Sequence, residues 1–128
     1  MAHFPSHLKY SKEDEWYQQE GNIITCGITD YAQDQLSDVV FVELPEVGRV
    51  IKAKDSVAVL ESVKSVSDLY FPAEGEIMAV NEELTDQPEL VNQDPYEKGW
   101  VVKIKVEDTS FLDDLMDSKA YESQLEEE

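Results

Sequence analysis

Hydrophobic and polar residues alternate along much of the chain, in a pattern that predicts β-strands. Segment 100–106 is the clearest case, because large apolar residues occupy its even-numbered positions and lysines occupy positions 103 and 105. Other short runs are rich in Val and Ile and are bounded by Gly, Pro or polar clusters. These runs predict strands over 16–19, 23–28, 39–44, 47–52, 56–63, 66–71 and 76–80. The Gly-Asn pair at positions 21 and 22 predicts a hairpin turn between the first two.

Helical patterns are short and lie mostly late in the chain. Thr29-Asp30 followed by Gln33 predicts a capped helix over 30–36, which the polar residues that follow it end. Apolar spacing then predicts one amphipathic helix near 111–116 and another over 118–125. Many strands with few helices predict an all-β core with peripheral helices, arranged as a sandwich or a small barrel.

The length of 128 residues predicts one domain, with a loose N-terminal arm at 1–9 and a frayed acidic tail at 126–128. No run of apolar residues is long enough to span a bilayer. The first ten residues show neither a secretory signal nor a transit-peptide pattern. We therefore expect a cytoplasmic protein or, after processing, a mature mitochondrial one.

The net charge excludes some partners. Twenty-nine Asp and Glu against ten Lys and Arg give a formal charge of −19. Such a chain offers no basic surface for nucleic acid or for anionic membranes, so we expect neither as a partner. Self-repulsion favours a monomer, and complementary partners should carry basic patches.

No enzyme motif occurs in the sequence, so we expect no catalytic residue. His3 and His7 have a spacing that could bind a metal on a helix, but Pro5 lies between them in a segment without a helix signal, and we expect no metal site. Cys26 is the only cysteine. It falls in a predicted strand without an adjacent His or cation, which predicts a buried, structural thiol.

Lys64 lies at the centre of segment 56–71, which contains neither Gly nor Pro. In one interpretation the segment is a single long strand and the lysine points outward. In the other, the chain reverses at 63–65 and Lys64 stands at the tip of a hairpin. Strand length favours reversal, whereas the absence of an Asn-Gly turn does not. A lysine on such a tip is a candidate for acylation, although an ordinary surface lysine is the more common case.

At this segment the sequence resembles the H proteins of the glycine cleavage system. The lipoyl-acceptor motif of that family matches Glu61-Ser62-Val63-Lys64-Ser65-Val66-Ser67-Asp68. Further matching positions cover nearly the whole chain: 8–10, 15–16, 27–33, 36, 38–45, 75–77, 80–81, 88–92, 94–96, 99–100 and 120–121.

The resemblance implies a mainly β fold, the barrel-sandwich hybrid, which is a flattened barrel of two sheets with an N-terminal hairpin and C-terminal helical turns. It also implies reversal at Lys64 and a lipoate joined to Lys64 by an amide bond. Glu61 resembles the acid by which lipoylating enzymes recognise acceptors. Asp68 and Glu15 match positions associated with a cleft that holds the amine of the loaded arm, where a carboxylate suits a cation.

The family works as a non-catalytic carrier. Its implied partners are a pyridoxal-phosphate glycine decarboxylase, a tetrahydrofolate-dependent aminomethyltransferase, a dihydrolipoyl dehydrogenase and a lipoylating enzyme. An H-like carrier that relays lipoyl groups to other complexes is the alternative, and an unmodified binding module is a third hypothesis. A biotin carrier is disfavoured, because Val63 and Ser65 flank the lysine where such carriers have methionines.

Three positions depart from the family pattern. Asp14 stands where a His often precedes the Glu-Trp pair, and Glu13 stands where Ser is often found. Ser37 replaces a common Gly, so we expect a less permissive backbone at that point.

Overall fold

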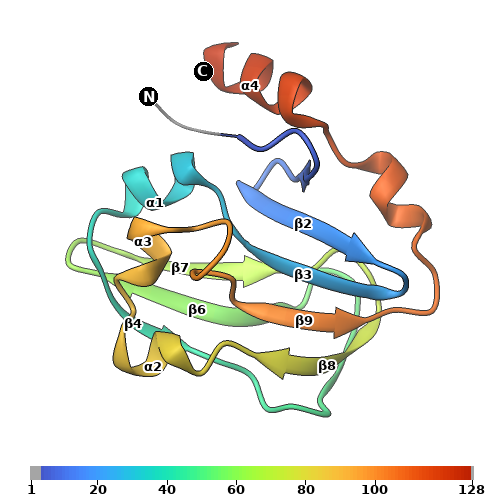
Figure 1. Cartoon of the computed structure of the whole chain (residues 1–128), viewed down its shortest axis with the longest axis horizontal. Helices are drawn as coiled ribbons and strands as arrows, with labels where there is room; N and C mark the ends of the chain where they lie inside the picture. The colour runs from blue at the N-terminus through green and yellow to red at the C-terminus, as the bar shows by residue number, and fades with distance from the viewer. Residues whose placement is uncertain (1–3, 128) are drawn as a thin grey trace.

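The computed structural model describes residues 4–127, with side chains as far as Leu125, and two antiparallel β-sheets dominate this part of the chain (Figure 1). The larger sheet has the order β1-β2-β3-β9-β8-β5, and the smaller has the order β4-β6-β7. Short helices lie at the edges of these sheets. The predicted mainly β architecture of two sheets is confirmed.

The strands follow the predicted segments closely. The larger sheet contains β1 (Lys9–Tyr10), β2 (Glu15–Glu20), β3 (Ile23–Ile28), β5 (Val50–Ile51), β8 (Gly75–Val80) and β9 (Val102–Lys105). The smaller sheet contains β4 (Val39–Glu43), β6 (Ser56–Ser62) and β7 (Val66–Tyr70). The strand predicted over 47–52 is wrong in extent. Arg49 N donates to Glu46 O at 3.2 Å and Gly48 has a φ of 95°, so a turn occupies the first half of that segment.

The helices are α1 (Asp30–Leu36), α2 (Glu83–Asp86), α3 (Leu90–Gln93), the 3-10 helix η1 (Ser110–Asp114) and α4 (Ser118–Glu127). Helix α1 has the predicted bounds, and the Thr29 hydroxyl caps it by accepting from Ala32 N at 3.1 Å. The helix predicted near 111–116 ends earlier than expected. Met116 instead forms a β-bridge with Tyr10, which draws the chain into an extended conformation. No helix in the described residues is long and apolar enough to cross a membrane.

The two sheets share one hydrophobic core. Ile24, Ile77 and Ile104 from the larger sheet and Leu60 and Leu69 from the smaller are completely buried within it. Cys26 belongs to the same cluster, which confirms the prediction of a buried thiol. Burial raises the pKa of this thiol well above its ordinary value, so it stays protonated and unreactive.

A second cluster joins the two ends of the chain, and it corrects the expected loose arm. Leu8 is only 2% exposed, and Lys9 pairs with Tyr17 in the sheet. The rings of Tyr10 and Tyr121 stack with centroids 4.9 Å apart, which fastens α4 to β1. The arm's first three residues, including His3, lie outside the described residues. The expected frayed tail at 126–128 is corrected in part, because the backbone of residues 126 and 127 belongs to α4, whereas residue 128 lies outside the described residues.

Candidate functional site

The chain reverses direction at Lys64, as the hairpin interpretation requires. Strands β6 and β7 pair antiparallel, and Ser62 N donates to Ser65 O at 2.8 Å to close the turn between them. Lys64 is exposed and lies in the connection between β6 and β7. This connection is the loop that projects at the left edge of Figure 1. Within the described residues its ammonium has neither a hydrogen bond nor a salt bridge, so the amine faces solvent.

The hydroxyl of Ser62 builds this turn. It accepts from the amides of Lys64 at 3.3 Å and Ser65 at 3.1 Å, and it donates to the Ser65 carbonyl at 3.2 Å. Neither Val63 nor Lys64 has a positive φ. The side chain of Ser62 therefore supplies what a Gly or Asn supplies in the usual two-residue hairpin, and it explains a tight turn without the Asn-Gly signal.

A second support reaches the turn from outside the hairpin. Val63 N donates to the carbonyl of Asp38 at 3.2 Å. The neighbouring Ser37 has φ 67° and ψ −156°, a conformation that almost only glycine adopts without strain. Asn92 on α3 holds this segment, since its Nδ2 donates to Ser37 O at 2.7 Å and its Oδ1 accepts from Val39 N at 2.8 Å.

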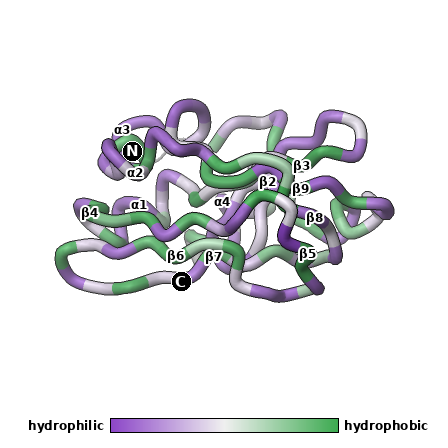
Figure 2. The backbone as a smooth tube through the Cα atoms, turned by 90° about the horizontal axis from the view of Figure 1, so that it is seen from below, coloured by the Kyte–Doolittle hydropathy of each residue, from purple (hydrophilic) through white to green (hydrophobic). Residues whose placement is uncertain are grey.

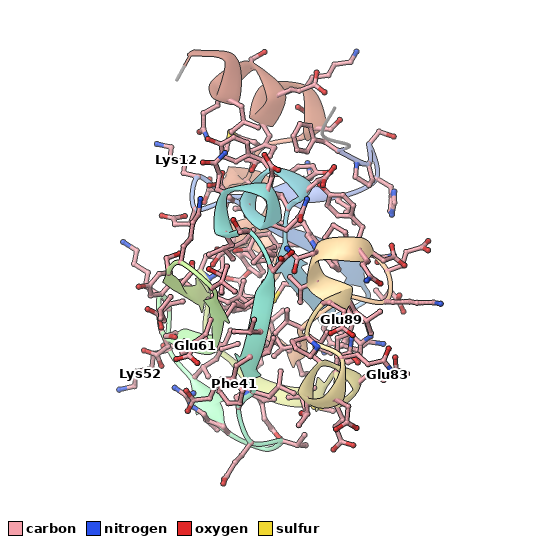
Figure 3. All side chains as sticks on the ribbon, turned by 90° about the vertical axis from the view of Figure 1, so that its left-hand side faces the viewer. Lys12, Phe41, Lys52, Glu61, Glu83 and Glu89 are labelled. Carbon is pink, nitrogen blue, oxygen red and sulfur yellow. The ribbon has the colours of Figure 1, made fainter. Side chains whose placement is uncertain are left out.

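Glu61 lies beside the turn on the outward face of the smaller sheet. The register places Phe41 of β4 on one side of Glu61 and Val66 of β7 on the other. Figure 3 looks onto this end of the molecule and shows Glu61 and Phe41 near each other. Within residues 4–127 the Glu61 carboxylate has no cation as a partner.

A pocket of about 460 Å³ opens where β7 ends, and Glu15 lies in it. The pocket is also lined by Tyr70 and by two lysines, Lys12 and Lys54. Glu15 is 2% exposed, and its carboxylate accepts from the hydroxyls of Ser11 at 3.1 Å and Tyr17 at 2.7 Å and from the amide of Tyr70. This last contact joins β2 of the larger sheet to β7 of the smaller.

The pKa of Glu15 is raised to about 7, mainly because burial disfavours the charged form. The hydrogen bonds from Tyr17, Tyr70 and Ser11 favour the carboxylate, but they offset only part of this effect. A cation that enters the pocket would favour the ionised form, so Glu15 suits an amine ligand better than a neutral one.

Asp68 lies near this pocket but does not line it. Its carboxylate accepts from Ser56 Oγ at 2.8 Å and from the Tyr70 hydroxyl at 3.5 Å. Tyr70 therefore lies between the two predicted acids, in contact with Asp68 through its hydroxyl and with Glu15 through its amide. Strand β7 runs from the Lys64 turn through Asp68 to Tyr70, whose amide donates to Glu15.

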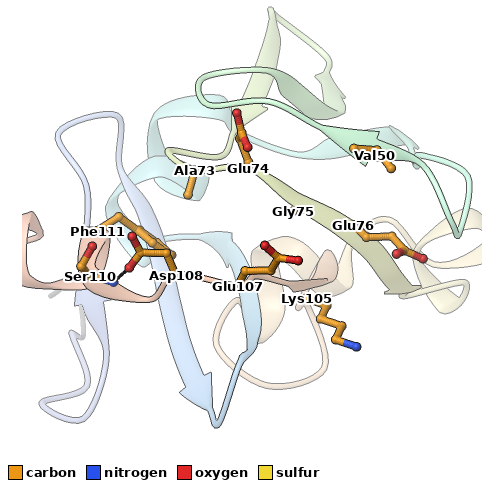
Figure 4. Close-up of a pocket in the computed structure, with 10 residues that line it drawn as sticks. All are labelled: Val50, Ala73, Glu74, Gly75, Glu76, Lys105, Glu107, Asp108, Ser110 and Phe111. Carbon is orange, nitrogen blue, oxygen red and sulfur yellow. Dashed lines mark hydrogen bonds between the residues drawn. The ribbon is translucent and has the colours of Figure 1, made fainter.

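A second cavity, of about 600 Å³, lies elsewhere and holds none of the predicted site residues (Figure 4). Its lining includes Glu74, Glu76, Glu107 and Asp108. The amide of Ser110 donates to Asp108 at 2.9 Å and lowers the pKa of that carboxyl. In the described residues no group of three or more His, Cys, Asp or Glu side chains is placed to hold a metal ion.

Comparison with known proteins decides the family. The model of the glycine cleavage H-protein family matches residues 8–128. The chain belongs to the glycine cleavage H-protein family. It is 56% identical to the glycine cleavage system H protein of Symbiobacterium thermophilum over 96% of both chains, and 54% identical to that of Escherichia coli over the full length of both.

Solved structures agree with this assignment to the H-protein family. The crystal structure of a glycine cleavage system H protein from Mycobacterium marinum superposes with a TM-score of 0.82 at 35% sequence identity. The match covers 94% of this chain and 98% of that one.

Sequence reasoning missed several residues that shape the site. Ser11 and Tyr17 hold Glu15, Ser62 builds the turn, and Asn92 supports it. Of these residues, only Ser62 could have been predicted from the sequence. A serine side chain in a turn commonly accepts a hydrogen bond from the backbone amide two residues ahead, which here is that of Lys64. The others are brought to the site by strand pairing and by the position of α3, which no local pattern predicts.

Proposed function

We propose that this H protein is the lipoyl carrier of a glycine cleavage system, with lipoate joined by an amide to Lys64. The observation that carries the proposal is an exposed lysine on a tight, doubly supported turn in a chain of this family. In this role the chain catalyses nothing itself; it positions the cofactor for enzymes that do.

The residues around Lys64 suit a covalent group at this position. Its ammonium is exposed, so an acylating enzyme can reach it, and its loss of charge on amide formation breaks no contact among the described residues. When attached, lipoate supplies a disulfide that can be reduced and that can carry an aminomethyl group. The Ser62 hydroxyl and the Asp38 carbonyl fix the base of the arm, which limits the volume that the arm explores.

Three acids have proposed roles in this function. Glu61 identifies the hairpin to the lipoylating enzyme. Glu15 and Asp68 bind the amine end of the loaded arm, with Glu15 inside the pocket and Asp68 at its edge beside Tyr70. The buried carboxylate of Glu15 is a strong partner for a cation, because little water competes with it.

The proposed partners are those of the family: a pyridoxal-phosphate glycine decarboxylase, a tetrahydrofolate-dependent aminomethyltransferase and a dihydrolipoyl dehydrogenase. The net charge of −19 supports docking to basic surfaces on these enzymes. Steering of this kind weakens with ionic strength, so turnover in the reconstituted system should fall as salt is added.

Intact mass and peptide mapping of protein from its native source test the proposal. We expect a lipoyl increment on Lys64 alone. Lys64→Ala should fold normally and fail to support glycine cleavage, whereas Lys52→Ala, which removes another exposed lysine, should remain active. An unmodified Lys64 that also resists a competent lipoyl ligase would overturn the proposal, and a modified chain that serves only as a lipoyl donor to other complexes would favour the relay alternative.

A further inference from the structure

Exposed apolar side chains gather around Lys64. Eight large hydrophobic side chains are exposed in the described residues, and four of them surround this turn: Val40 at 54%, Phe41 at 48%, Val63 at 69% and Val66 at 62%. We call these four residues the apolar collar. In Figure 2, which colours the backbone by residue hydropathy, green hydrophobic positions lie near the turn between β6 and β7. Grouped exposed apolar residues of this kind mark interaction sites on soluble proteins.

A β-bulge places two of the four side chains on the surface. The pairing of β4 with β6 shifts between Val39, which faces Ser62, and Phe41, which faces Glu61. Val40 is therefore an extra residue in β4, and both it and Phe41 are exposed, although a regular strand would bury one of them. The irregularity lies directly opposite the base of the Lys64 turn.

The same register puts a carboxylate inside the apolar collar. Phe41 faces Glu61, and Glu61 faces Val66, so apolar side chains flank this acid on both neighbouring strands. When a partner covers the collar and removes water, an unpaired Glu61 carboxylate would be costly to bury. The surface therefore fits a partner that brings a cation to Glu61 and apolar groups to the residues beside it.

The length of the lysine side chain determines which partner must touch this surface. Before modification, the Lys64 amine stands only four carbons from the backbone. An enzyme that acylates it must bring the reacting carbonyl within that distance of the turn, and so must cover the residues that flank it. Enzymes that act after acylation meet a group at the end of a longer arm, so they can work without covering the collar.

We propose that the apolar collar is the docking surface for the enzyme that acylates Lys64, and that this enzyme offers an apolar recess with a cationic side chain opposite Glu61. The inference rests on the proposed function. In the step itself, the Lys64 ammonium first loses one proton to solvent, and its Nζ then forms an amide bond with the carbonyl carbon of an activated acyl donor, an acyl adenylate or a thioester. A second proton leaves Nζ as the amide forms and goes to solvent or to the leaving group. The bond from that carbonyl to its leaving group breaks, and the leaving group keeps the electron pair.

The test measures acylation of the full chain by a purified lipoate ligase supplied with lipoate and ATP. Phe41→Ser should lower kcat/KM at least about tenfold, mainly by raising KM, as the loss of a central aromatic contact does at interfaces. Val50→Ser is the matched control, because Val50 is 75% exposed but lies on β5 of the other sheet. It should leave kcat/KM within about twofold of wild type.

A second variant tests the same surface at a position where substitution should not disturb folding. Val63→Ser changes a side chain that is 69% exposed in the turn, outside the core, and it should lower kcat/KM in the same way. After complete acylation and chemical reduction of the arm's disulfide to the dithiol, both variants should be reoxidised by dihydrolipoyl dehydrogenase, with NAD+ as the electron acceptor, at the wild-type rate.

The outcomes separate the two proposals. Failure of the ligase to modify the wild-type chain would overturn the proposed function and this inference together. A wild-type rate of acylation in both variants would overturn the inference alone. Normal acylation with slowed reoxidation would also overturn it, and would assign the collar to a partner that acts on the loaded arm.

Discussion

Asn92 holds Ser37 in a backbone conformation that serine rarely adopts. The Nδ2 of Asn92 donates to the Ser37 carbonyl at 2.7 Å, and its Oδ1 accepts from the amide of Val39, two residues further along the chain, at 2.8 Å. The Asp38 carbonyl, which accepts from Val63 N beside Lys64, belongs to the same peptide group as that Val39 amide. One side chain on α3 thus supports the Lys64 turn through the 37–39 segment, although no hydrogen bond among the described residues joins it to Lys64 or to the hairpin.

Replacing Asn92 should loosen that support. Asn92→Ala removes several partly buried hydrogen bonds, so we expect the free energy of unfolding to fall by about 2 kcal/mol. Faster hydrogen exchange of the Val63 and Val39 amides, measured by NMR, should accompany the loss. Gln93→Ala on the same helix changes an exposed side chain and is the control. Unchanged exchange at Val63 in Asn92→Ala would show that the support is not transmitted to the turn.

Restoring glycine at position 37 should stabilise the chain. Ser37 has φ 67° and ψ −156°, where a side chain is strained and glycine is not. We expect Ser37→Gly to raise the free energy of unfolding by about 1 kcal/mol in urea denaturation. Combined with Asn92→Ala, it should recover part of the lost stability. A decrease in stability for Ser37→Gly alone would mean that the serine is not strained.

The Lys64 turn should depend on the hydroxyl of Ser62. Ser62→Ala leaves the amides of Lys64 and Ser65 without their acceptor, and we expect a loss of about 1 kcal/mol. Those two amides should exchange faster, while the amides of β6 keep their protection. Ser65→Ala removes a hydroxyl that makes none of these bonds, and it should match wild type. Equal exchange in both variants would argue that strand pairing alone holds the turn.

Glu15 should make stability depend on pH. Its pKa is about 7 in the folded chain and about 4.5 when unfolded, so the native state binds more protons between these values. Stability contributed by this group is therefore present below pH 4.5, falls as the pH rises to 7, and is level above that. The change amounts to about 3 kcal/mol.

The contribution of Glu15 is measured as the difference in unfolding free energy between wild type and Glu15→Gln, obtained by urea denaturation from pH 4.5 to 8. As the pH rises from 4.5 to 7, the unfolding free energy of Glu15→Gln should increase relative to that of wild type. Above pH 7 the difference should stay constant. Asp114→Asn, which removes an exposed acid from the same pocket, controls for the general loss of negative charge. A difference that does not vary with pH would contradict the raised pKa.

Local patterns in the sequence predicted most of the strands and α1, because strand alternation and the Thr29 cap are properties of short segments. They did not predict that Leu8 and Tyr10 pack under α4, since that contact joins the two ends of the chain. They also left the Lys64 reversal open. Its turn is stabilised by a serine side chain and by a carbonyl from another segment, neither of which resembles a standard turn signal.

The site shows the same division between local and distant contributions. Lys64, Glu61 and Asp68 follow from one contiguous motif, and their placement along β6 and β7 needed only the hairpin. Glu15 reaches β7 because two different sheets meet there, and its raised pKa depends on burial that no sequence pattern reports. Such properties depend on which segments the folded chain brings together.

The register of Phe41, Glu61 and Val66 makes acylation of Lys64 depend on whether a newly made chain has folded. These residues come from three strands and are neighbours only after the smaller sheet has formed. A peptide that spans the Lys64 motif alone lacks Phe41 and Val40. An enzyme that requires the whole collar would therefore not acylate unfolded or misfolded chains. Acylation of Lys64 would then be restricted to chains in which the smaller sheet has folded correctly.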